Sequence, residues 1–176
     1  MAVSYKDHPH DFGLISLILH WLNAILILMI CFSGRQIQNP TSTLTQAEVL
    51  AVHTNVALLA IPIIIIRIIW RTYQGYPMPK QTNKYRKSIK FYNYFLFFLI
   101  VASYLSALYI TSFNLFEIIK IDEAILSNET KALSMHQFIG IAIYFALLIH
   151  ILGASKQILM SKGSYSKRMI SLRDEN

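Results

Sequence analysis

Four of the six histidines in the sequence lie inside long apolar stretches, where a ring nitrogen needs a partner. These four are His20, His53, His136 and His150. Imidazole is the most common metal ligand in proteins, and it also forms hydrogen bonds between helices. The four residues are therefore the candidates for chemistry. The other two, His8 and His10, lie in a polar N-terminal arm and are expected to be solvated.

The spacing of two of these histidines indicates a common direction. His150 follows His136 by 14 residues. In an α-helix, 14 steps of about 100° end about 40° short of four full turns. Both rings would then point the same way, about 21 Å apart along the helix axis. Gly140 and Gly153 follow the two histidines by about one turn, which would let a flat group approach the backbone or would serve ordinary helix packing.

The elements that carry these residues are predicted to be membrane-spanning helices. The chain has 176 residues, of which 55% are hydrophobic and 14% charged, a composition atypical of a soluble enzyme or a disordered protein. Four apolar stretches exceed the roughly 20 residues needed to cross a bilayer, at residues 13–34, 48–70, 91–112 and 135–160. We predict an all-α membrane protein with an arm (1–12), a four-transmembrane-helix bundle (13–160) and a basic tail (161–176).

Basic residues predict the orientation of this bundle. The connection at residues 71–90 holds six Lys or Arg and no acid, and the tail adds four more. The other two connections carry fewer basic residues, and the third holds four acids. The positive-inside rule then places both termini in the cytoplasm. The net charge of +7 is thus expected to serve topology and contact with anionic lipid, with no nucleic acid as partner.

This topology sorts the histidines into two pairs. His20 and His150 would lie near the inner face, and His53 and His136 near the outer face. Two imidazoles facing each other at each of two depths are what two b-type haems require, one axial nitrogen coming from each side.

Other roles for these histidines stay open. Separate hydrogen bonds between helices, a proton relay in a small transporter, or a zinc or copper site would also use them. The metal reading is weaker because each pair offers only two ligands. One cysteine, Cys31, excludes a disulfide framework, a thiolate zinc site and an iron–sulfur cluster.

Several neighbouring polar residues would suit a haem site. Arg67 follows His53 by 14 residues, at the inner level, where its charge would suit a haem propionate. Arg71 is expected to extend to the membrane surface. Asn23 and Asn55 are candidates to orient imidazole N–H groups, or simply to bond between helices.

The sequence resembles the bacterial cytochrome b561 family, four-helix di-haem proteins of the inner membrane. The residues that carry the resemblance are His20 with Trp21, His53 followed by Arg67 and Arg71, then His136 and His150 before the basic tail. The likeness covers about residues 14–170.

The resemblance implies ligation of two haem b groups by these four histidines, and electron transfer with a ubiquinone pool. Some members of the family are superoxide oxidases, which pass electrons from superoxide at the outer face to ubiquinone. In that case Arg35, Lys120 and Lys131 would attract the anion. Relatives in the wider superfamily are cytochrome subunits of dehydrogenases or hydrogenases, so an anchor that relays electrons for a partner subunit is the alternative.

Overall fold

Among the residues that it describes, the computed structural model has four α-helices. It describes residues 4–9, 11–38, 45–75, 77, 86–116 and 123–160, and no strand occurs among these. The helices are α1 (Leu14–Gln38), α2 (Gln46–Gln74), α3 (Arg86–Phe116) and α4 (Glu123–Met160). Each contains a segment long and apolar enough to cross a membrane. The prediction of an all-α protein with four such helices is confirmed, and every helix extends a few residues or more beyond its predicted span.

Local hydrogen bonds pair the backbone N–H groups at the N-terminal ends of α1 and α2. The backbone N–H groups of Leu14 and Ile15, which have no partner inside α1, donate to the carbonyls of Ser4 and Tyr5 in the N-terminal arm. At the start of α2, Thr45 and Glu48 form a capping box. The N-terminal arm therefore caps the start of α1, and the side chains of Thr45 and Glu48 cap the start of α2.

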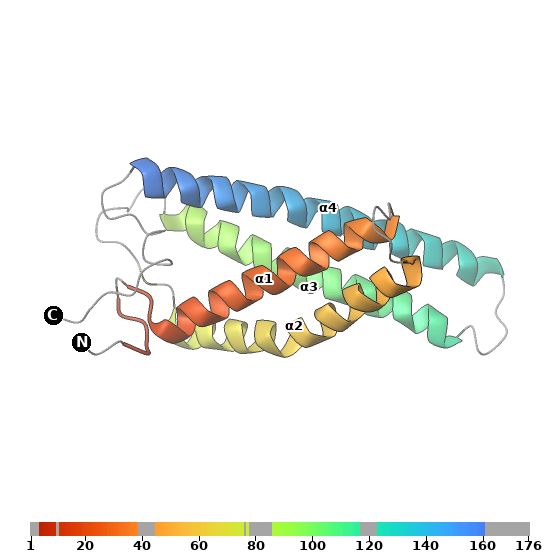
Figure 1. The fold of residues 1–176 in the computed structure, drawn as a ribbon, viewed down its shortest axis with the longest axis horizontal. Coiled ribbons are helices and arrows are strands. Elements are labelled where there is room, and N and C mark those ends of the chain that lie inside the picture. Colours follow the sequence, from red (N-terminus) through yellow and green to blue (C-terminus); the bar gives the residue numbers. More distant parts are fainter. Residues whose placement is uncertain are drawn as a thin grey trace. The chain divides into compact units, whose positions relative to one another are not determined.

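The chain divides into two compact units, residues 1–83 with 153–176 and residues 84–152. In the first unit α1 and α2 run antiparallel (Figure 1), and small and aliphatic side chains such as Leu26, Ala60 and Ile64 are buried. We call one end of this hairpin the arm end (residues 4–16 with 67–75) and the other the distal end (residues 30–37 with 45–53). In the second unit α3 and α4 also run antiparallel.

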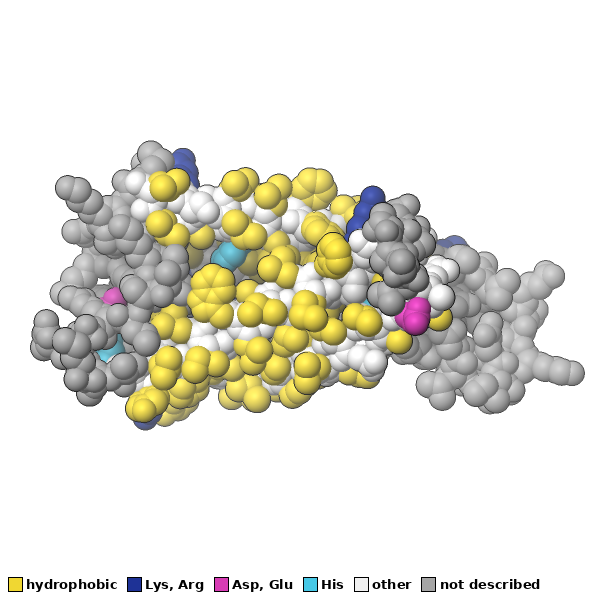
Figure 2. Space-filling model, viewed as in Figure 1, with side chains coloured by type: hydrophobic (Ala, Val, Ile, Leu, Met, Phe, Trp, Pro, Cys, Tyr) yellow, Lys and Arg dark blue, Asp and Glu magenta, His cyan; other side chains and the backbone are white. Residues whose placement is uncertain are grey.

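Large apolar side chains cover the helix surfaces. Phe32, Leu58, Phe98 and Phe138 are each more than 60% exposed. Figure 2 shows hydrophobic side chains spread over the visible helix faces, with charged side chains near the helix ends. Exposure on this scale is typical of a surface that lipid tails cover.

Candidate functional site

His53 is held at the distal end by the last turns of α1. Its Nδ1 lies 3.0 Å from the carbonyl oxygen of Ile30 and 3.2 Å from Oγ of Ser33. A carbonyl oxygen only accepts, so this contact requires the proton on Nδ1. In the neutral ring Nε2 then carries the lone pair, which is the tautomer that binds a metal through Nε2 while Nδ1–H is anchored to the protein.

A glycine makes room for this ring. A Cβ at Gly34 would lie 3.0 Å from Cε1 and 3.3 Å from Nδ1 of His53, closer than ordinary van der Waals contact. α1 therefore approaches the imidazole at a position where a side chain would have to displace it.

His136 has the same type of partner in the other unit. Its Nδ1 lies 2.8 Å from Oγ of Ser106, and that hydroxyl donates to the carbonyl of Ser103 at 2.8 Å. Because the single hydroxyl proton is used in the bond to Ser103, the oxygen accepts from Nδ1–H of His136. The lone pair is again on Nε2, so His53 and His136 share one tautomer although they belong to different units.

His20 has the opposite partner. Its Nδ1 lies 2.9 Å from Nη2 of Arg67 at the arm end. A guanidinium has no acceptor, so Nδ1 of His20 accepts and the neutral ring carries its proton on Nε2. An iron bound at Nδ1 would replace Arg67, and an iron bound at Nε2 would move the proton to Nδ1. Ligation through either nitrogen of the neutral ring therefore changes the partner of Arg67.

His150 lies against an aromatic ring of α3. The rings of His150 and Tyr92 are stacked with centroids 6.2 Å apart and an interplanar angle of 7°. The Tyr92 hydroxyl donates to the carbonyl of Ala146, one turn before His150. α4 is unbroken from His136 to His150, as the predicted four-turn separation requires.

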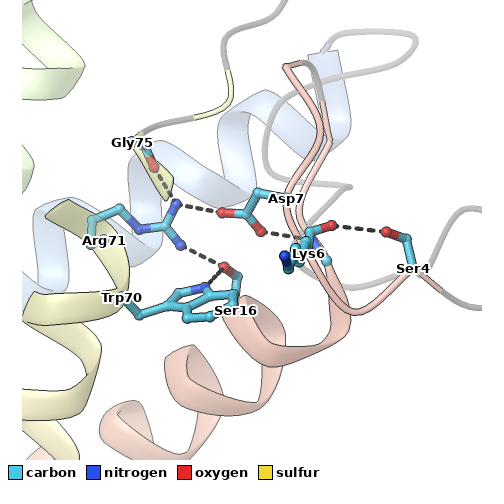
Figure 3. A network of polar contacts seen from close by, with 8 residues as sticks. Ser4, Lys6, Asp7, Ser16, Trp70, Arg71 and Gly75 are labelled. Carbon is cyan, nitrogen blue, oxygen red and sulfur yellow. Dashed lines mark hydrogen bonds and ion pairs between the residues drawn. The ribbon is translucent and has the colours of Figure 1, made fainter. Parts of the chain in front are cut away.

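A network of polar contacts lies one turn beyond His20 at the arm end (Figure 3). Arg71 donates to the carboxylate of Asp7 at 2.9 Å, to the carbonyl of Gly75 and to Oγ of Ser16. The Arg71 and Asp7 side chains are only 10% and 2% exposed. Trp70 donates from Nε1 to the same Ser16 oxygen. Arg71 was expected at the membrane surface, but it joins the arm to both helices, because Asp7 folds back to meet it.

The structure thus brings Arg67 to His20 and places His53 at the other end of the hairpin. The prediction that His8 is a surface residue is consistent with its exposed contact to Ser4. His10, Lys120 and the basic tail lie outside the described residues. Among the described residues, no group of three or more His, Cys, Asp or Glu could hold a metal ion.

The partners of the histidines were not those expected from the sequence. Asn23 donates to Leu19 in its own helix. Ser33, Ser106 and a main-chain carbonyl lie at the rings instead. A serine in an apolar helix cannot be recognised as a histidine partner from the sequence until the helix that it faces is known. The one available indication was that Tyr92 and Ser106 are 14 residues apart, the same interval as between His136 and His150.

Comparison with known proteins identifies the family. Residues 11–172 match the family model of prokaryotic cytochrome b561. The chain belongs to this family. Membership in cytochrome b561 implies a multi-pass membrane protein that binds haem b and transfers electrons. Searches of curated proteins and of solved structures gave no match.

The residues present fit a haem. His53 and His136 have the proton on Nδ1 and the lone pair on Nε2, the arrangement that axial ligation needs. Arg67 supplies a cation inside the α2 span, where an anionic group such as a propionate would stabilise it.

Proposed function

We propose that this cytochrome b561 binds two haem b groups, one between His53 and His136 and one between His20 and His150. The observation that carries the proposal is the hydrogen bonding of His53 and His136, whose Nδ1 atoms donate to fixed protein acceptors. The order of the four histidines along oppositely running helices supports the pairing. Haem b supplies a one-electron iron couple when bound. Each group would be held by two histidines, which would leave no ligand position on the iron for oxygen.

We propose further that electrons enter from a donor on the periplasmic side and leave to ubiquinone in the bacterial inner membrane. Superoxide is the proposed donor. Two superoxide anions each lose one electron and become oxygen, while one quinone takes up two electrons and two protons and becomes quinol. Arg35 and Lys131 have exposed side chains near the ends of their spans and would attract the anion.

The proposed orientation has both termini in the cytoplasm. It is supported by the basic connection at residues 71–90, compared with the mixed charges of the connection at residues 113–134. With this orientation the distal end of α1 and α2 would face the periplasm, and so would the start of the fourth span, which carries His136. His53 and His136 would then belong to the site that receives the electron.

Stopped-flow mixing of the oxidised, haem-loaded protein with superoxide tests this function. We expect reduction of the haem absorption bands that superoxide dismutase prevents, and one quinol formed for every two superoxide anions consumed when ubiquinone is present. A matched His8→Ala variant should behave as the natural protein, because His8 lies outside the helices.

A protein that dithionite reduces but superoxide does not would contradict the superoxide proposal. It would favour the alternative, an electron-relaying anchor for a soluble dehydrogenase or hydrogenase subunit. Co-purification of such a subunit from the native membrane would distinguish this role.

A further inference from the structure

The histidines of the two proposed sites have opposite electrostatic surroundings. At His53 and His136, Nδ1 faces oxygen atoms that accept its proton. At His20, Nδ1 faces the guanidinium of Arg67, which donates. This difference follows from the register of each hairpin, because Ser106 and Arg67 lie opposite the histidines on the neighbouring helix.

A hydrogen bond from Nδ1–H to an acceptor moves electron density into the ring. The imidazole then becomes a stronger donor to iron, which favours the oxidised state and lowers the midpoint potential. The Ser106 oxygen is well placed for this effect, because its own proton is directed to Ser103 and its lone pair is directed to His136. Ser106 is also buried, so water does not weaken the bond.

A nearby cation has the opposite effect. The ferric state carries one more positive charge than the ferrous state, so a guanidinium beside the ligand disfavours oxidation and raises the potential. Arg67 keeps its charge whichever acceptor it contacts, because the guanidinium is always protonated. The next cation along α2, Arg71, contacts Asp7 and Ser16, one turn away from His20, so Arg67 is the cation at the ring itself.

We propose that Ser106 and Arg67 set the two potentials in opposite directions, with the His53–His136 site lower and the His20–His150 site higher. This inference rests on the two-haem function proposed above. An electron received at the first site would then pass spontaneously to the second, so that the first would be reoxidised as the second is reduced. Ser106 and Arg67 act through the histidines and are positioning residues in this sense.

Spectroelectrochemical titration of the purified, haem-loaded protein tests the proposal. The natural protein should titrate in two resolved steps. Ser106→Ala should raise the lower potential and leave the higher one in place, because it removes the buried hydroxyl acceptor of His136 and leaves only the main-chain carbonyl of Ser103 at the ring. Ser103→Ala is the matched control on the same helix and should change neither, since Ser103 contributes its main-chain carbonyl.

The complementary variants concern Arg67. Arg67→Gln should lower the higher potential alone, and Arg67→Lys should retain most of the natural value because it keeps the charge. If Ser106→Ala loses haem, Ser106→Cys offers a weaker acceptor of similar size, and a smaller rise of the lower potential is expected.

Two resolved potentials that neither Ser106 nor Arg67 variants move would overturn this inference and leave the two-haem function standing. The inference is also wrong if the potential that responds to Ser106 is the higher one. A natural protein with fewer than two haems by pyridine haemochrome assay would instead contradict the proposed function itself. The titration and the haem count therefore separate the two failures.

Discussion

Tyr92 and His150 lie ring against ring, with an interplanar angle of 7°, across α3 and α4. A second contact between these helices joins Ser106 to His136. Ser106 follows Tyr92 by 14 residues along α3, and His136 precedes His150 by 14 residues along α4. Equal intervals in opposite directions mean that the two antiparallel helices keep one register over four turns. Both histidines of α4 are therefore positioned by the same helix, one by an aromatic face and one by a hydroxyl group.

The close approach of α1 to His53 predicts the effect of a single methyl group. In Gly34→Ala the new Cβ would lie 3.0 Å from the His53 ring, so the ring must move away from Ile30. We expect a cost of about 1–3 kcal/mol in the free energy of unfolding and, under the proposed two-haem function, a changed absorption band at the haem that His53 would hold. The band of the second proposed haem would be the internal control. A spectrum identical to that of the natural protein would contradict this prediction, because it would mean that the His53 ring tolerates the new methyl group without moving.

Gly140 predicts a different outcome, because a Cβ there meets nothing within 4 Å. In the haem-free protein Gly140→Ala should not destabilise α4 and should stabilise it by about 0.5–1 kcal/mol through the lower entropy of the unfolded chain. In the loaded protein the same methyl group should reduce haem content if a porphyrin packs against this turn. Measurement of thermal unfolding without haem and of haem content with it separates the two effects. Unchanged haem content would remove Gly140 from the site.

The ion pair between Asp7 and Arg71 should contribute to stability. Both side chains are almost completely buried, so Asp7→Asn leaves a guanidinium without its counter-charge. We expect the free energy of unfolding in detergent to fall by about 3 kcal/mol, and the Asp7→Asn, Arg71→Gln double variant to fall by less than the sum of the two single changes. Strictly additive losses would mean that the arm is held by other contacts.

The orientation can be tested by labelling with a membrane-impermeant maleimide. In a Cys31→Ala background, we expect Lys131→Cys to react in intact spheroplasts and Ser4→Cys to react only after the membrane is opened. Lys131 lies at the start of the fourth span and is exposed, and Ser4 lies in the arm. The reverse pattern would place the termini in the periplasm and would assign the entering electron to the His20–His150 site.

The elements of this fold could be predicted because each span is an apolar run bounded by polar residues, and helical periodicity placed Arg67 on the same face of its helix as His53. The ligand partners could not be predicted. Which residue faces His136 depends on the register between α3 and α4, which periodicity along one helix does not determine. The fold of the arm could not be predicted either, because it depends on a contact between residues far apart in the sequence. Asp7 looks like a solvated acid in the sequence, and only the structure shows its contact with Arg71, 64 residues away.

The haem content of the purified chain tests the central claim most directly. A pyridine haemochrome assay, referred to protein concentration, should give two haem b per chain, and His53→Ala or His150→Ala should each reduce the ratio to one. His8→Ala, which removes an exposed histidine of the arm, should keep the ratio at two. A colourless chain, or one whose haem content is unchanged when a helix histidine is replaced, would contradict ligation by these four residues.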